Sequence, residues 1–245
     1  MRTILITGVN SNMGKHVAKE LSKDYKIIGM GRTNPNIKKI RFIKFDLRRS
    51  IPKTKVDVVI HLASLTRICE TNPELAYEVN VDGTRKLIKS VGNAKFIYIS
   101  TGSVYGFSNK ILSEEDIPKP HNVYANTKYN AELLLKNHKN YCILRLFAPY
   151  GLPMKEKSAI NRTAYNINKI IKINPIHIFD FVRLLKIIIE KDNLEKVYNV
   201  AGEEVVGTKN KNSKDMIADI SRLKTIGFKQ KIYLKEGLKE VLKWK

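Results

Sequence analysis

Cysteine, tryptophan and long apolar runs are all scarce in this 245-residue chain. Its only cysteines are Cys69 and Cys142, and it has one tryptophan. Two thiols without a spacing pattern indicate neither a disulfide framework nor a metal site, so we expect no metal and a reducing cytoplasm. No segment approaches the roughly 20 apolar residues that a membrane helix needs, and the N-terminus lacks the features of a signal peptide. We therefore expect a cytoplasmic protein with no membrane partner.

Acidic residues are also few. The chain has 45 Lys and Arg against 23 Asp and Glu, a net charge of +22. A nucleic-acid surface and a general compositional drift both explain this excess. Because the basic residues are spread along the chain and accompany no nucleic-acid-binding motif, the second explanation is favoured. The positive potential would still attract an anionic ligand such as a dinucleotide or a nucleotide sugar.

The first part of the chain alternates between two hydrophobic periods. Short apolar runs occupy residues 2–7, 25–30, 40–45, 56–63, 96–100 and 142–147, and helical spacing occupies residues 13–21, 73–91 and 123–135. Buried apolar strands separated by helices are typical of a parallel sheet covered on both faces. The pattern predicts an α/β fold with a doubly wound, Rossmann-like sheet.

After residue 151 the pattern weakens. It predicts helices over residues 181–189, 214–223 and 235–244 and a strand over 196–200. Asp180 is expected to cap the first of these helices. We therefore predict a dinucleotide-binding domain over residues 1–151. Residues 152–245 should form a small substrate lobe that is interleaved with the sheet and not independent.

The turn after the first predicted strand is a candidate phosphate site. A helix N-terminus in this place attracts the pyrophosphate of a dinucleotide. Gly8 permits a tight turn, Gly14 permits close packing, and Ser11 stands where a glycine usually gives access to the backbone. The predicted contacts in this turn are Thr7, Gly8, Ser11, Asn12, Met13 and Gly14. The alternative is an ordinary strand-to-helix turn.

The end of the second predicted strand bears on the form of the cofactor. An acidic residue there would bind the ribose hydroxyls of NAD, but the chain has Gly31 and Arg32. Because a guanidinium can bind a 2′-phosphate, NADP(H) is favoured over NAD(H). The alternative is a solvated arginine on a basic protein.

Seven segments, in order, resemble the motifs of the extended short-chain dehydrogenase/reductases, which include nucleotide-sugar epimerases, dehydratases and reductases. They are residues 7–14, 45–47, 61–64, 80–84, 100–106, 124–128 and 144–151. Beside Arg32, which is predicted from its charge and place, the resemblance implies further cofactor contacts from Asp46, Leu47, Leu62, Ala63, Ser64, Asn80, Ser100, Tyr124, Lys128 and Phe147. Residues 8–14, 72–80 and 99–101 are most similar to the dTDP-4-dehydrorhamnose reductases, whereas residues 105–106 and 176–180 look more like epimerases.

The resemblance assigns catalysis to Tyr124, Lys128 and Thr101. Tyr124 and Lys128 are four residues apart and share one helical face, where an ammonium favours the phenolate and makes the tyrosine a general acid/base. Thr101, at the end of a strand, would hold the substrate oxygen. Alone, the pair is more often a half-buried aromatic ring and a solvated amine, and Thr101 at the end of the preceding strand reverses this preference. His61 is expected to be a packing residue.

The substrate is expected to be an anionic nucleotide sugar. Dehydratases of this group carry an acidic pair where this chain has Gly102 and Ser103, so epimerisation or keto reduction remains. The predicted substrate contacts are Thr66, Arg67, Ser103, Arg162 and Arg183. Because residues 151–176 are a short segment for the family, a ketoreductase acting on a smaller substrate and a non-catalytic dinucleotide-binding scaffold stay open. The resemblance also allows a homodimer.

Overall fold

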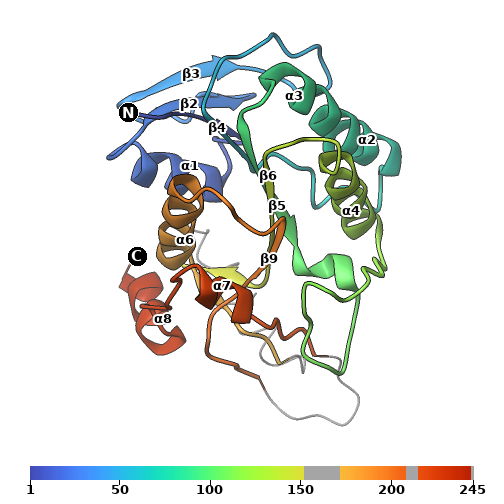
Figure 1. The fold of residues 1–245 in the computed structure, drawn as a ribbon, viewed down its shortest axis with the longest axis vertical. Helices are drawn as coiled ribbons and strands as arrows, with labels where there is room; N and C mark the ends of the chain where they lie inside the picture. Colours follow the sequence, from blue (N-terminus) through green and yellow to red (C-terminus); the bar gives the residue numbers. More distant parts are fainter. Residues whose placement is uncertain (152–171, 208–214, 244–245) are drawn as a thin grey trace. The chain divides into compact units, whose positions relative to one another are not determined.

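The computed structural model describes residues 1–151, 172–207 and 215–243 (Figure 1). These residues form two compact units that alternate along the chain. The first comprises residues 1–100 and 120–144, and the second comprises residues 101–119 and 145–245. The predicted lobe over residues 152–245 lies in the second unit, which also takes in residues 101–119 and 145–151.

The predicted Rossmann-like sheet is confirmed. Its strands are β1 (Thr3–Thr7), β2 (Lys26–Gly31), β3 (Ile40–Lys44), β4 (Val58–His61), β5 (Lys95–Thr101), β6 (Tyr141–Leu146) and β9 (Val197–Val200), in the order β3-β2-β1-β4-β5-β6-β9. The pairs from β3 to β5 are parallel. The order reverses between β1 and β4, and this switch point is where open α/β sheets bind ligands.

The helices of the first unit are α1 (Asn12–Leu21), α2 (Pro73–Tyr77), α3 (Gly83–Val91) and α4 (Val123–Leu135). Figure 1 shows α2, α3 and α4 together on one side of these strands and α1 on the other. The helix predicted over residues 73–91 is interrupted by a π-helical turn, Glu78–Asp82. There the Thr84 hydroxyl donates to the carbonyl of Asn80 at 2.6 Å, and such turns occur often at functional sites.

The second unit contains shorter elements. They are a 3₁₀ turn (Gly102–Tyr105), β7 (Pro149–Tyr150), β8 (Ile176–His177), α6 (Ile178–Glu190), α7 (Ser221–Thr225) and α8 (Leu234–Lys243). Strand β9 also belongs to this unit, where the amide of Phe147 donates to the carbonyl of Val200 at 2.9 Å. Helices α6 and α8 confirm two of the three helices predicted after residue 151. No helix in the described ranges is long and apolar enough to cross a membrane.

The helix predicted over residues 214–223 is wrong. Residues 215–220 are extended, and their backbone bonds go to distant partners instead of the next turn of a helix. The amide of Leu112 donates to Ile217 at 2.8 Å, and the amide of Asp219 donates to Leu112 at 2.7 Å. The Asp219 side chain then accepts from the amide of Ser221 at 2.8 Å, and α7 starts there. Tertiary pairing overrides the local helical period in this segment.

Candidate active site

The turn between β1 and α1 is closed by contacts that only glycine allows. Gly8 has a φ of +69°, and a Cβ on it would lie 2.8 Å from the backbone of Ala63. A Cβ on Gly14 would lie 2.2 Å from the carbonyl oxygen of Gly8. Ser11 uses its hydroxyl as the N-cap of α1, where it accepts from the amide of Gly14 at 2.9 Å. The turn therefore presents the N-terminus of α1 beside the ends of β1 and β4.

A cleft of about 470 Å³ opens at this turn, within the first unit. Nine of the predicted cofactor contacts line it: Thr7, Gly8, Ser11, Arg32, Asp46, Leu47, Leu62, Ala63 and Ser64. Two predicted substrate residues, Thr66 and Arg67, also line it. The volume is in the range of small-molecule sites, and the cleft wall includes Gly8, whose missing side chain lets the backbones of the two strand ends pack together beside the N-terminus of α1. These residues fit a dinucleotide.

A carboxylate and a guanidinium pair at the rim of the cleft. Arg48 Nη2 donates to Asp46 Oδ2 at 2.7 Å, and the amide of Arg48 donates to Asp46 Oδ1 at 3.0 Å. The side-chain hydrogen bond from Arg48 is the largest of several causes that lower the pKa of Asp46 to about 2. The sequence analysis missed Arg48, and its only signal was its place directly after the motif at residues 45–47.

Helix α4 holds the end of β5 through one face. Lys128 is 2% exposed, and its ammonium donates to the carbonyl of Ile99 at 2.6 Å and lies 4.1 Å from the ring centroid of Tyr98. Burial lowers the pKa of Lys128 to about 7, and the charge of Glu132 partly opposes that shift. Ser100 donates to Glu132 at 2.5 Å. The amine of Lys128 is therefore buried rather than solvated, and it contacts β5 directly.

Tyr124 is placed by the start of α4. The Asn122 side chain caps the helix by accepting from the amide of Ala125 at 2.8 Å. Glu70 accepts from the amides of Val123 and Tyr124 at 3.0 and 3.4 Å. Tyr124 is half-buried, one helical turn before Lys128. Glu132 follows one turn later still and was missed by sequence reasoning, although a glutamate continuing the 124–128 spacing was its signal.

Asn80 connects the π-helical turn to the cleft wall and to α4. Its side chain accepts from the amide of Leu65 at 2.7 Å and donates to the carbonyl of the same residue at 3.1 Å. It also donates to the hydroxyl of Thr127 at 2.9 Å, and Thr127 donates to the carbonyl of Tyr124 at 2.8 Å. Asn80 is thus bonded to α4, and it is not among the residues that line the cleft.

Thr101 and Ser103 lie in the second unit, directly after the first unit's part of β5. The hydroxyl of Thr101 donates to that of Ser103 and accepts from the amide of Ser103, both at 3.2 Å. A Cβ on Gly102 would lie 2.6 Å from the ring of Phe147, which is therefore packed against the backbone beside Thr101. The meeting of Thr101 with Tyr124 stays a prediction, because the two residues belong to different units.

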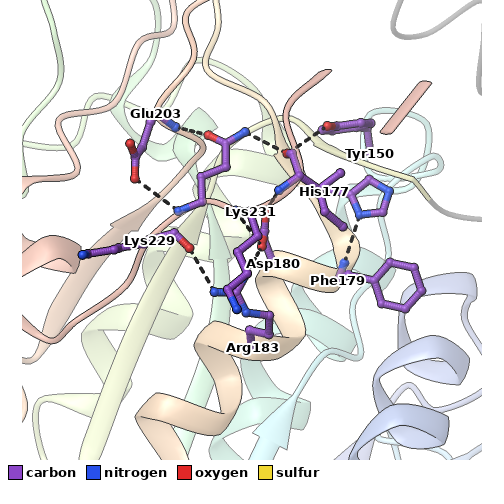
Figure 2. A network of polar contacts seen from close by, with 10 residues as sticks. Tyr150, His177, Phe179, Asp180, Arg183, Glu203, Lys229 and Lys231 are labelled. Carbon is purple, nitrogen blue, oxygen red and sulfur yellow. Dashed lines mark hydrogen bonds and ion pairs between the residues drawn. The ribbon is translucent and has the colours of Figure 1, made fainter. Parts of the chain in front are cut away.

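Arg183 belongs to a polar network in the second unit (Figure 2). It pairs with the fully buried carboxylate of Asp180 and donates to the carbonyl of Lys229 at 3.1 Å. Asp180 also accepts from the amides of Lys231 and Ile232. The prediction that Asp180 caps α6 is wrong, since His177 is the N-cap and Asp180 bonds a distant loop. Arg162 lies outside the described residues.

Comparison with known proteins identifies the family. The family model described as "NAD dependent epimerase/dehydratase family" matches residues 4–201. The chain belongs to the NAD dependent epimerase/dehydratase family. Membership confirms the predicted family and, with it, an NAD-dependent enzyme of the epimerase/dehydratase type. Among the residues that the structure describes, no group of His, Cys, Asp and Glu is placed to hold a metal ion.

Proteins with several different names resemble the chain. Methionine adenosyltransferase 2 subunit beta from Bos taurus is 26% identical over an alignment that covers 98% of this chain and 87% of that protein. GDP-6-deoxy-D-talose 4-dehydrogenase from Aggregatibacter actinomycetemcomitans is 29% identical over 61% of this chain and 52% of its own length. The structure of UDP-glucuronic acid 4-epimerase from Bacillus cereus in complex with NAD has a TM-score of 0.82 at 23% identity, and 99% of each chain is covered.

Proposed function

We propose that this chain binds a pyridine dinucleotide in the cleft at Gly8 and acts on a carbinol or ketone of a nucleotide sugar. The observation that carries the proposal is the buried Lys128, one helical turn from Tyr124 and bonded to the strand that ends in Thr101. A buried amine that desolvation shifts toward neutrality is typical of catalytic sites. The open cleft beside the N-terminus of α1 supplies a place for the cofactor.

The chain's own residues would manage the proton. A bound nicotinamide supplies hydride acceptance and donation. Tyr124 would take the proton of the carbinol hydroxyl as the carbonyl forms and return it when the carbonyl is reduced. Lys128, when protonated, would favour the phenolate of Tyr124 by its charge. Thr101 would donate a hydrogen bond to the substrate oxygen and hold it toward Tyr124.

Arg32 supports a preference for NADP(H). It lines the cleft directly after β2, and the end of that strand carries no carboxylate that would repel a 2′-phosphate. Asp46, which also lines the cleft, is already paired with Arg48. Thr7, Gly8 and Ser11 would hold the pyrophosphate with the help of the α1 N-terminus. The complex of UDP-glucuronic acid 4-epimerase with NAD supports a dinucleotide in this cleft. The proposed preference for NADP(H) over NAD(H) rests on Arg32 alone.

A nucleotide sugar is the proposed substrate class. The relatives named as GDP-6-deoxy-D-talose 4-dehydrogenase and UDP-glucuronic acid 4-epimerase support it. Thr66 and Arg67 line the exposed end of the cleft and would contact the substrate. Arg183 would have to leave its pair with Asp180 to do the same, which makes it the weaker of the proposed contacts.

A non-catalytic binding subunit is the second candidate. It is favoured by the relative named as subunit beta of methionine adenosyltransferase 2, whose alignment covers almost all of this chain. In that case the cleft would bind a dinucleotide, but Tyr124 would be dispensable for the protein's role.

Turnover of nucleotide sugars by the full chain separates the candidates. The purified protein is incubated with NAD or NADP and a panel of UDP-, GDP- and dTDP-sugars, and products are separated by chromatography. Removing the proton-transfer group in Tyr124→Phe should lower turnover by about 10²–10⁴-fold with little change in cofactor affinity. Tyr129→Phe, on the same helix, is the matched control and should stay active. Dinucleotide binding without turnover of any sugar would support the subunit, and an active Tyr124→Phe variant would refute the chemistry.

A further inference from the structure

The end of β4 carries a histidine that does more than fill space. His61 is fully buried, and both of its ring nitrogens have hydroxyl partners. Nδ1 lies 2.6 Å from the hydroxyl of Thr7, at the end of β1. Nε2 lies 2.9 Å from the hydroxyl of Thr84, on α3. A side chain that only packed against its neighbours would not need two such partners, so the ring joins two elements of the first unit.

The donor and the acceptor of each hydrogen bond around His61 follow from the chemistry of the groups. The carbonyl of Asn80 can only accept, so the hydroxyl of Thr84 donates its single hydrogen to that carbonyl, at 2.6 Å. The oxygen of Thr84 must then accept from Nε2–H of His61. Burial, followed by the charge of Lys128, lowers the pKa of His61 to about 3, so the ring is neutral and its Nδ1 carries no hydrogen.

The same reasoning extends to the cofactor turn. Nδ1 of His61 must accept from the hydroxyl of Thr7, which leaves the Thr7 oxygen free to accept from the amide of Ala63, at 3.2 Å. Ala63 is the residue whose backbone would meet a side chain on Gly8 at 2.8 Å. Thr7, Gly8 and Ala63 all line the cleft. The histidine therefore fixes the close approach of two backbone segments at the floor of the cleft.

On the other side of His61, the series of hydrogen bonds reaches α4, the helix of Tyr124. The carbonyl of Asn80 accepts from Thr84, while the side chain of Asn80 holds both backbone groups of Leu65, which lines the cleft. The same side chain donates to Thr127, which donates to the carbonyl of Tyr124. A series of buried and part-buried hydrogen bonds, joined through the backbone and side chain of Asn80, thus runs from Thr7 to α4, and every member lies in the first unit.

We infer that His61 is a positioning residue for the cofactor turn. In one fixed tautomer it orients the hydroxyl of Thr7, which holds Ala63 against Gly8, and it ties this arrangement through Thr84 and Asn80 to the helix of Tyr124. The inference rests on the proposed function, because it assigns the orientation of these groups to dinucleotide binding. Loss of the Thr7 side of the ring should weaken cofactor binding more than loss of the Thr84 side.

Two amide variants separate the sides of the ring. The amide of His61→Asn reaches the place of Nδ1 and keeps a partner for Thr7, whereas the longer amide of His61→Gln reaches the place of Nε2 and keeps a partner for Thr84. Calorimetric titration with NADPH should give a Kd about tenfold higher for His61→Gln and within about twofold of wild type for His61→Asn. Ser90→Ala removes a buried hydroxyl of α3 that takes no part in the hydrogen bonds of His61, and it should leave the Kd unchanged. Equal effects of the two amides, or effects that follow stability alone, would overturn the inference.

Nitrogen NMR of the wild-type protein tests the predicted tautomer of His61 without any cofactor. The imidazole of His61 should show a protonated Nε2 and an unprotonated Nδ1 from mildly acidic to neutral pH. The opposite tautomer, or a ring that gains a proton in this range, would overturn the inference. If the wild-type protein binds neither NADPH nor NADH, the proposed function fails and this role fails with it. If it binds normally and the two amides behave alike, only the role of His61 fails.

Discussion

Lys128 is the residue at which burial and charge conflict most directly. Its ammonium is removed from water. The compensating interactions are with the carbonyl of Ile99, the ring face of Tyr98 and the charge of Glu132. Such a group is retained at a cost in stability, which is reasonable where the charge serves a reaction. We therefore expect Lys128 to affect the pH dependence of folding as well as catalysis.

Replacing Lys128 by methionine should stabilise the protein in a pH-dependent way. The pKa of Lys128 is about 7 in the folded chain, against 10.5 as its ordinary value. Between these values the unfolded chain binds more protons, so wild-type stability rises with pH. The advantage of Lys128→Met should thus be largest at and below neutral pH, by roughly 2–5 kcal/mol, and shrink toward about pH 10. Urea unfolding of both proteins across this range measures it, and a pH-independent difference would contradict the buried, titrating amine.

Sequence reasoning found the residues with motif positions and missed their partners. Tyr124, Lys128 and Gly8 stand at recognisable spacings. Arg48 and Glu132 follow such motifs in the chain, but the roles that the structure gives them come from their contacts with Asp46 and with Ser100. Which buried polar groups find one another depends on how elements pack, and a single sequence does not record it.

At the scale of elements, the β1–α1 turn is a tightly constrained part of the first unit. It combines a left-handed backbone at Gly8 with direct packing of that residue on Ala63. Gly92 offers a comparison, since its φ is +59° but nothing lies within 4 Å of the place where its Cβ would be. Both glycines have a positive φ, and of the two only Gly8 has neighbouring atoms at the place of a Cβ.

Alanine at these glycines should therefore have unequal effects. Gly92→Ala should destabilise the protein by about 1 kcal/mol, from the backbone conformation alone. Gly8→Ala adds a clash with backbone and should lose about 2–4 kcal/mol, together with cofactor affinity. Urea unfolding gives the first comparison, and NADPH titration the second. Equal losses of stability would mean that the turn yields without strain and that the tight packing is not needed.

The elements themselves were predicted well where hydrophobic period and neighbouring structure agree. The strand runs and the helix over residues 123–135 fall where their apolar residues place them. One prediction failed for a tertiary reason, since residues 215–220 pair with Leu112 instead of forming a helix. That pairing depends on a contact made far along the chain, which a local period does not contain. The helix predicted over residues 73–91 is present, with a π-helical turn at Glu78–Asp82 that the apolar spacing did not indicate.

At the scale of the whole molecule, the excess of basic residues must be separated from specific recognition of the cofactor. A net charge of +22 attracts any dinucleotide to some extent, with or without a specific site. Specific recognition should instead depend on one position. Arg32 lines the cleft, whereas Arg41 is an exposed arginine of β3 outside it, so alanine at either removes the same charge. The pair therefore distinguishes a built cofactor site from general attraction.

Calorimetric titration of the full chain with NADPH and NADH is the most direct test of the account. It predicts one binding site per chain, with NADPH bound more tightly than NADH. Arg32→Ala should weaken NADPH by about tenfold and leave NADH unchanged, while Arg41→Ala should change neither. Binding of NADH alone would contradict the role of Arg32, and absence of binding by both dinucleotides would contradict the cofactor cleft itself.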